Sequence, residues 1–177
     1  MRTTRLMLTA TALALLSACA AERKPPPPVV RPVPRPTPAP APPPRPPADW
    51  RDVPITPGDW TYRAEATGSS ARFGTPGAEP LLSLSCERAA GRLVLRRAGA
   101  APGPVPLTIV TTSSTRSLSA VPEPAPATGL AVALAPRDPI LDAMAFSRGR
   151  FMVEVPGLPP LYLPSWPEFA RAIEDCR

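Results

Sequence analysis

Short runs of alternating apolar and polar side chains fill residues 59–135. Such period-two alternation is typical of strands that bury one face, so the pattern predicts seven strands. They are residues 59–66, 71–75, 81–87, 92–97, 107–112, 115–121 and 129–135. The apolar faces include Trp60, Tyr62, Ala64 and Ala66 in the first strand, Leu82, Leu84 and Cys86 in the third, and Leu130, Val132 and Leu134 in the seventh.

Turn residues between these runs predict antiparallel hairpins. Gly68-Ser69, residues 89–91 and Ser113-Ser114 each separate two runs by a few residues only. Residues 99–106 and 122–128 are rich in glycine or proline and are predicted to be loops. Many short strands broken by turns are typical of all-β domains. We therefore predict a mainly β fold, an antiparallel sandwich or a barrel-like domain.

The C-terminal part adds two helices to this sheet. Asp138-Pro139 is a typical helix start, with the aspartate as cap and the proline in the first turn, and predicts a short helix near residues 139–146. Residues 151–155 and 161–163 form two more strands on either side of Pro156-Gly157.

The second helix is predicted near residues 166–176. Ser165 and Glu168 have the spacing of a capping box, in which each side chain accepts a hydrogen bond from the other residue's amide. Trp166, Phe169, Ile173 and Cys176 fall on one apolar stripe of this helix. We expect the stripe to dock on the sheet.

Composition separates this domain from the N-terminal third of the chain. Of 31 prolines, fourteen lie in residues 25–47, where they predict an extended polyproline spacer of about 70 Å at about 3.1 Å per residue. Five basic and no acidic residues lie in residues 23–48, so this segment is suited to anionic lipid or cell-wall polymer, to a proline-binding partner domain, or to a spacer role alone. Residues 48–177 carry 13 arginines and 13 acidic residues, and this formal neutrality argues against nucleic-acid binding.

The N-terminus has the parts of a secretory signal. Arg2 and Arg5 precede an apolar run over residues 6–16, which is too short to span a bilayer because about 20 apolar residues are needed. The following Leu16-Ser17-Ala18-Cys19 resembles the lipobox of bacterial lipoproteins. The resemblance implies cleavage before Cys19 and a diacylglyceride on its sulfur; the alternative is an ordinary cleaved signal and a free product.

The lipoprotein resemblance also implies a location and a domain plan. Residues 1–18 are then the signal peptide, residues 19–47 the lipidated cysteine and linker, and residues 48–177 the globular domain. Ala20 follows the cysteine in place of aspartate, which implies a periplasm-facing outer-membrane lipoprotein of a Gram-negative envelope. The implied partner is the membrane, through the lipid on Cys19, with a cell-wall polymer or an envelope protein as further candidates.

Cys86 and Cys176 remain once Cys19 is lipidated. A secretory signal leads to an oxidising compartment, where an even pair of cysteines usually bonds, so we predict a Cys86–Cys176 disulfide. The alternative is two buried free thiols. Two cysteines without any histidine in the chain are a poor metal site, and we predict no metal and no cofactor.

No catalytic motif is present in the sequence, and the absence of histidine removes the commonest general base. Weaker candidates are the hydroxyl-rich residues 111–114, the carboxylates Asp138 and Asp142, and the turn Arg148-Gly149-Arg150, which could bind an anion. Trp50, Trp60 and Trp166 are predicted to pack rather than to stack on sugars. We predict a binding or structural role without enzymatic activity.

Two other functions stay open at this point. One is a periplasmic inhibitor that inserts residues 99–106 into the cleft of a hydrolase. The other is a hydrolase that uses carboxylates alone, which requires two acids facing each other across a cleft. The strand-rich body ending in a cysteine-bearing helix is similar to small secreted β-sandwich proteins of the invasion-associated locus B type. This likeness of pattern assigns no residues.

Overall fold

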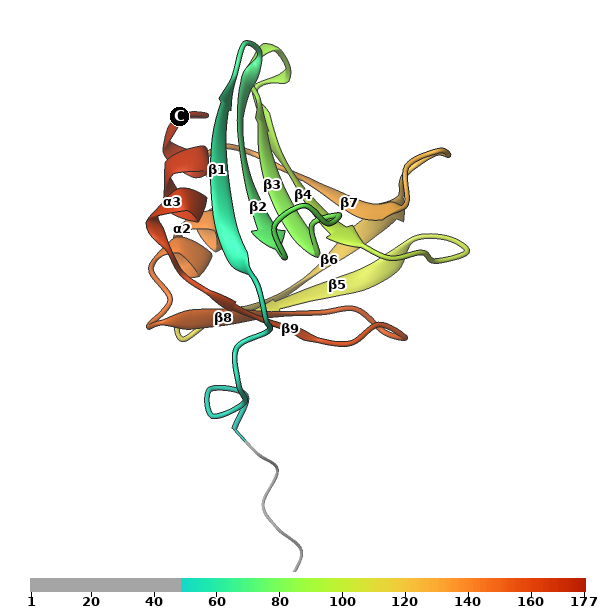
Figure 1. The fold of residues 1–177 in the computed structure, drawn as a ribbon, viewed down its shortest axis with the longest axis vertical. Coiled ribbons are helices and arrows are strands. Elements are labelled where there is room, and N and C mark those ends of the chain that lie inside the picture. Colours follow the sequence, from blue (N-terminus) through green and yellow to red (C-terminus); the bar gives the residue numbers. More distant parts are fainter. Residues whose placement is uncertain (1–48) are drawn as a thin grey trace, which may run out of the picture. The chain divides into compact units, whose positions relative to one another are not determined.

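The computed structural model describes residues 49–177. The predicted signal peptide, lipobox and proline linker lie outside the described residues. The domain is mainly β: nine antiparallel strands form one strongly curled sheet, and two short α-helices accompany it (Figure 1). The predicted fold class is therefore confirmed.

The strand order in the sheet is β1-β2-β3-β4-β7-β6-β5-β8-β9. The strands are β1 (Asp59–Glu65), β2 (Gly68–Gly74), β3 (Leu82–Glu87), β4 (Arg92–Ala98), β5 (Val105–Val110), β6 (Thr115–Pro122), β7 (Gly129–Leu134), β8 (Arg150–Glu154) and β9 (Leu161–Pro164). The helices are the 3-10 turn η1 (Arg88–Ala90), α2 (Pro139–Ala145) and α3 (Pro167–Glu174). Residues 49–177 contain no helix that is long and apolar enough to cross a bilayer.

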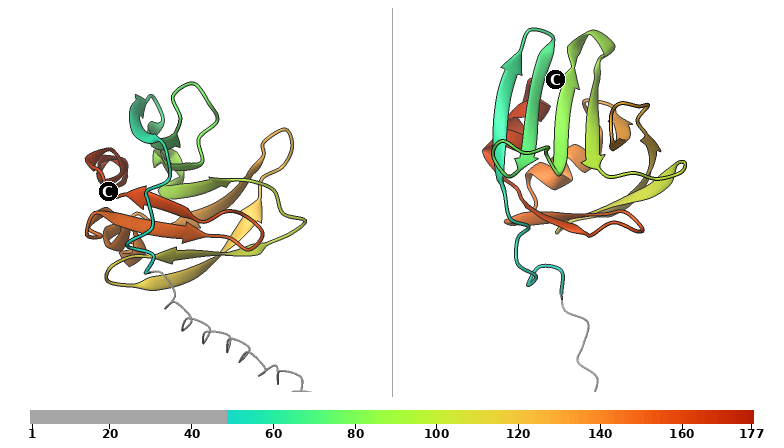
Figure 2. Two further views of the ribbon diagram at one scale, coloured as in Figure 1. Left: turned by 60° about the horizontal axis from the view of Figure 1, so that its bottom comes forward. Right: turned by 45° about the vertical axis from the view of Figure 1, so that its right-hand side comes forward.

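The sheet bends where β6 meets β7. Only two residue pairs, Val121 with Ala131 and Pro122 with Leu130, connect these strands, whereas β5 and β6 pair along six residues. The sheet therefore opens into two walls. Figure 2 shows β1 to β4 forming one wall and β5, β8 and β9 crossing beneath it.

Apolar side chains from both walls and both helices fill the space inside the curl. Trp60 contacts Phe73 and Phe169 with ring centroids 5.3 and 5.1 Å apart, and Phe169 contacts Phe151 at 5.3 Å. This aromatic row connects β1, β2, α3 and β8, so α3 is part of the core. The predicted apolar faces of the third and seventh strands are buried as expected.

Two details of the predicted hairpin β1–β2 are wrong. The turn lies at Ala66-Thr67, and Gly68 is already the first residue of β2. A Cβ at Gly68 would lie 1.9 Å from the Cys86 carbonyl oxygen, so this glycine permits a close approach of β3 and is not a turn residue. Ala64 and Ala66 are exposed, unlike Trp60, which is buried.

The two helix starts have different outcomes. The Asp138 side chain accepts a hydrogen bond from the Ile140 amide at 3.0 Å, which confirms the predicted cap of α2. The predicted capping box of α3 is wrong: Trp166 is the cap residue, and no side chain bonds there. The Ser165 hydroxyl donates instead to the Met144 carbonyl at 2.9 Å, because α2 lies next to it. Trp166 is 42% exposed and leaves the apolar stripe, in which Ala172 is buried.

Candidate functional site

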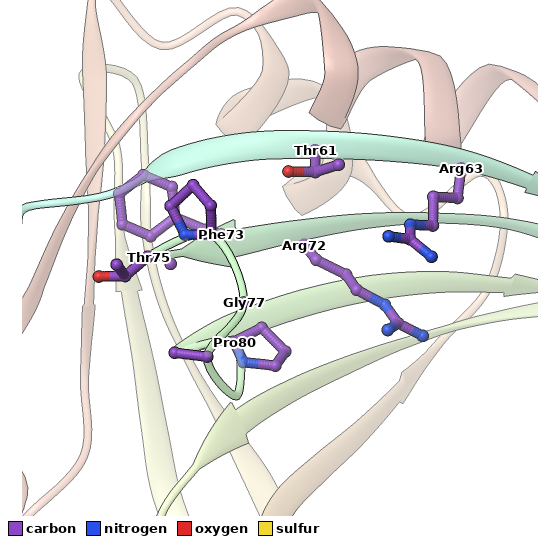
Figure 3. A pocket seen from close by; sticks show the side chains of 10 residues that line it. Thr61, Arg63, Arg72, Phe73, Thr75, Gly77 and Pro80 are labelled. Atoms are coloured by element: carbon purple, nitrogen blue, oxygen red, sulfur yellow. The ribbon is translucent and has the colours of Figure 1, made fainter.

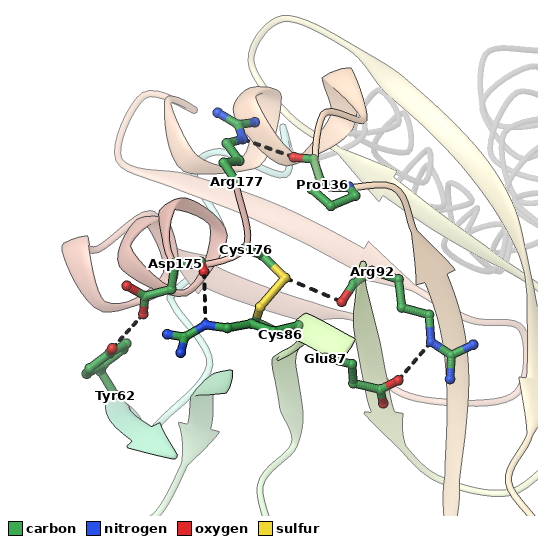
Figure 4. Close-up of a disulfide and its surroundings, with 9 residues drawn as sticks. Tyr62, Cys86, Glu87, Arg92, Pro136, Asp175, Cys176 and Arg177 are labelled. Carbon is green, nitrogen blue, oxygen red and sulfur yellow. Dashed lines mark hydrogen bonds and ion pairs between the residues drawn. A yellow bond between two sulfur atoms is a disulfide. The ribbon is translucent and has the colours of Figure 1, made fainter. Parts of the chain in front are cut away.

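Helix α3 closes the inner face of β1, β2 and β3 and brings the C-terminus to the sheet. Its buried residues are Phe169, Ala172 and Ile173. Just beyond the helix, the Cys176 sulfur lies 2.13 Å from that of Cys86 on β3, and their Cα atoms are 5.5 Å apart (Figure 4). The register of strand and helix therefore meets the geometric requirement of the predicted disulfide.

A second tie between sheet and helix lies beside the sulfurs. The Tyr62 hydroxyl of β1 donates to Asp175 Oδ2 at 2.5 Å. This bond lowers the pKa of the Asp175 carboxyl below its ordinary value and raises the pKa of the Tyr62 phenol. The carboxyl's contribution to folding is complete above the ordinary aspartate pKa and is lost as pH falls through the lowered value. The phenol's contribution is complete below the ordinary tyrosine pKa and is lost as pH rises through the raised value, so the bond stabilises the folded state across neutral pH.

Two arginines complete this polar cluster. The Arg171 guanidinium lies over the Tyr62 ring, 4.2 Å from its centroid. The Arg88 side chain donates to the Asp175 backbone carbonyl at 3.5 Å. Tyr62 is thereby fixed by a hydrogen bond at its hydroxyl and by a cation on its face.

A concave surface runs between strand β1 and helix α3. We call it the β1–α3 groove; it has a volume of about 450 Å³ and is lined by Tyr62, Pro167, Glu168, Ala170, Arg171, Glu174 and Asp175. Three carboxylates and one guanidinium line it, so its formal charge is negative. One oxygen of Glu168, Oε2, is buried and has no hydrogen-bond partner within residues 49–177. An unpaired buried acceptor is costly, so this carboxylate is the least well satisfied group of the groove lining.

The opposite face of the same strand carries positive charge. Arg63 on β1 and Arg72 on β2 line a hollow of about 240 Å³, together with the loop that follows β2 (Figure 3). Arg72 lies 4.0 Å from Glu65, a loose ion pair, and Arg63 makes no ion pair among the described residues. Strand β1 thus separates an acidic hollow on its inner side from a basic hollow on its outer side.

The structure brings together the hydroxyl-rich residues 111–114 and the turn at Arg148, which are distant in the sequence. The Arg148 amide donates to the Thr112 hydroxyl at 3.1 Å, and the Thr112 amide donates to the Ser147 hydroxyl at 3.1 Å. Arg148, Thr112 and the 78% exposed Phe146 line a third hollow, of about 500 Å³. The two arginines of the candidate anion-binding turn do not act together: Arg150 donates to the Val53 carbonyl, whereas the Arg148 side chain is exposed.

The two candidate carboxylates of α2 do not face each other. Asp138 caps the helix and pairs with Arg116 at 2.5 Å, and Asp142 pairs with Arg177 at 2.7 Å. In the part of the chain that the structure covers, no group of three or more His, Cys, Asp or Glu residues could hold a metal ion.

The contacts of two tryptophans and the extent of the candidate inhibitory loop are defined in the structure. Trp60 is buried and donates to the Pro164 carbonyl at 2.8 Å, while Trp50 lies under the Arg51 guanidinium. The loop is shorter than predicted, because β5 begins at Val105. Gly99 lies against Leu158, and the tip contains only alanine, glycine and proline.

One buried charge was missed from the sequence. Arg97 lies on the inner face of β4 and is 5% exposed, and desolvation lowers the pKa of its guanidinium. It donates to the backbone carbonyls of Ala98 and, at 3.1 Å, Pro159. Arg97 therefore ties β4 to the loop between β8 and β9. Only the position of that loop could have revealed this role.

No protein-family model, curated protein or solved structure matches this chain.

Proposed function

We propose that this chain is a lipid-anchored envelope protein whose β domain binds a protein partner. Cys19 carries the lipid, the proline-rich residues 19–47 link it to the domain, and the domain acts by recognition, without catalysis. The membrane is the partner of the N-terminus, and the outer membrane, facing the periplasm, is the location that the lipobox resemblance favours.

The observation that carries the anchoring proposal is the pairing of the other two cysteines. The chain has three cysteines, and the sulfurs of Cys86 and Cys176 lie at bonding distance from each other. This pairing leaves Cys19 of the Leu16-Ser17-Ala18-Cys19 motif free for acylation. A disulfide that joins a strand to the last helix also suits an exported domain, since such bonds persist in oxidising compartments.

The β1–α3 groove supports recognition over catalysis. Its three carboxylates all belong to the α3 segment, and the Tyr62 side chain forms the opposite wall. Acid–base chemistry by carboxylates alone needs two acids on opposite sides of a bound substrate. With Asp175 and Arg171 engaged by Tyr62, the remaining acids, Glu168 and Glu174, are instead suited to a cationic ligand.

The Cys19→Ser variant tests the anchor. We expect it to lose the lipid, to remain as uncleaved precursor or be released, and to leave the detergent phase in which the acylated protein partitions. The matched control is the Cys86→Ser, Cys176→Ser double variant, which loses two cysteines and keeps the lipobox; it should still incorporate a labelled fatty acid. A Cys19→Ser protein that is processed and partitioned like the wild type would contradict the proposal.

A further inference from the structure

Strand β1 ends the sheet, and within residues 49–177 no strand pairs with its outer edge. The Phe73 carbonyl accepts a hydrogen bond from the Leu81 amide at 2.8 Å, so the backbone amide and carbonyl of Phe73 point toward β3. The direction of these backbone groups alternates from residue to residue along a strand. The backbone groups of Arg72 therefore point toward β1, and those of its partner Thr61 point toward β2. The amides and carbonyls of Trp60, Tyr62 and Ala64 consequently point away from the sheet and are available to another strand.

The β1–α3 groove lies directly beside this open edge, because Tyr62 belongs to both. Glu168, Glu174 and Asp175 are its acids and Arg171 its base, which gives a formal charge of minus two. Asp175 and Arg171 are already engaged with Tyr62, whereas the half-buried Glu168 and the exposed Glu174 make no ion pair within residues 49–177. The charge available to a ligand is therefore carried mainly by two glutamates.

The geometry points to a binding site for an extended segment of a partner protein, which adds to β1 as an antiparallel strand and places lysine or arginine side chains in the β1–α3 groove. This inference rests on the proposed function, since it names the class of partner. Backbone bonds to the edge supply affinity, and the groove supplies selectivity for alternate side chains.

The spacing of the cationic side chains follows from strand geometry. In an antiparallel pair, two residues that exchange both backbone hydrogen bonds lie directly opposite, with side chains on the same face of the sheet. The residues that bond to Tyr62 and its outward-facing neighbours thus have side chains on the inner face, where α3 lies. Basic residues at every second position enter the groove, and the residues between them lie on the outer face near Arg63.

Charge also distinguishes this partner from a second copy of the chain. Pairing two β1 edges would place one acidic groove beside another, which like-charge repulsion disfavours. A basic strand meets the opposite sign in the groove. Small neutral residues between its basic positions avoid Arg63 on the other face, which makes no ion pair within residues 49–177.

A labelled peptide of about eight residues with alternating lysine and threonine, blocked at both ends, is the probe. Fluorescence anisotropy at low salt, with the full mature protein in neutral detergent, measures its binding. N-methylation of the lysine amides removes the donors that face β1, and we expect it to weaken binding at least about tenfold. N-methylation of the threonine amides, which face solvent, should leave binding within about twofold, and a glutamate-for-lysine peptide should not bind.

Variants of the chain test both halves of the site. Ala64→Pro removes an edge donor without breaking the β1–β2 ladder and should weaken binding at least about fivefold. Glu168→Gln should weaken it about two- to fivefold. Glu154→Gln removes the same charge from an exposed position on β8 and is the matched control, with no expected effect. Thermal melting of each variant verifies that the fold is kept.

Three results would overturn the inference: no saturable binding of the lysine peptide, equal binding after lysine N-methylation, or a concentration-dependent dimer that excludes the peptide. These results are independent of the anchor. Peptide binding with normal partitioning of Cys19→Ser would overturn the anchoring proposal alone, whereas a lipidated protein that fails to bind would overturn only this site.

Discussion

The two end strands of the sheet, β1 and β9, differ in whether another segment of the chain bonds to their outer edge. The edge of β9 is covered: the Thr56 amide donates to the Tyr162 carbonyl, and the Tyr162 amide donates to the Thr56 hydroxyl, both at 2.9 Å. The edge of β1, seven residues long, pairs with no strand of residues 49–177. An uncovered edge is a hazard for aggregation, so the difference between the two edges is consistent with the proposed docking of a partner strand on β1.

The open edge is protected by charge rather than by cover. Asp59, Arg63 and Glu65 project from β1 and are exposed. Charged side chains on an end strand discourage pairing with apolar strands while permitting a complementary one. By contrast, β9 has four residues, of which Leu161, Leu163 and Pro164 are buried, and it relies on the segment before β1 for its cover.

The largest effect on this difference is expected from removal of the disulfide. Cys176→Ser should lower the free energy of unfolding by about 4 kcal/mol, because the bond closes a long loop, and should loosen the C-terminal end of α3. The groove beside the β1 edge would then be disturbed, whereas the β9 edge would stay covered. Urea denaturation followed by tryptophan fluorescence measures the loss.

The control is the Cys86→Ser, Cys176→Ser double variant. It should be about as unstable as either single variant, because each of these variants loses the same single disulfide. Two reactive thiols in the denatured, non-reduced protein would contradict the pairing and the docking of α3.

A smaller effect is expected at the covered edge. Thr56→Ala removes the acceptor of the Tyr162 amide and should cost about 1 kcal/mol, with faster hydrogen exchange at that amide. Thr67→Ala, in the exposed β1–β2 turn, removes the same hydroxyl elsewhere and should change stability by less than about 0.5 kcal/mol. Equal stability of the two variants would mean that Thr56 does not hold the β9 edge.

Alternation in the sequence was enough to predict the mainly β class and the buried faces of β3 and β7, and the Asp138-Pro139 motif predicted the cap of α2. These features depend on neighbours within a few residues. The turn was wrongly placed at Gly68 because this glycine is required by the close approach of the Cys86 carbonyl on another strand. The capping box failed for a similar reason, since Ser165 bonds to α2.

The candidate site was only partly predictable for the same physical reason. The apolar stripe of α3 and the strand position of Cys86 located the two cysteines on facing elements. The groove, in contrast, depends on which side of α3 meets the end of the sheet, and strand order is not encoded in periodicity. Tyr62 was predicted to face inward, but its bond to Asp175 joins residues 113 positions apart.

Residue-resolved hydrogen exchange on the mature protein tests the difference between the two edges most directly. In the free protein, the Tyr162 amide should be protected, and the amides of Trp60, Tyr62 and Ala64 should exchange rapidly, because they face no acceptor. Addition of the lysine–threonine peptide should protect these three amides and leave Tyr162 unchanged. Protection of the Tyr62 amide before any peptide is added, or an unprotected Tyr162, would contradict the account.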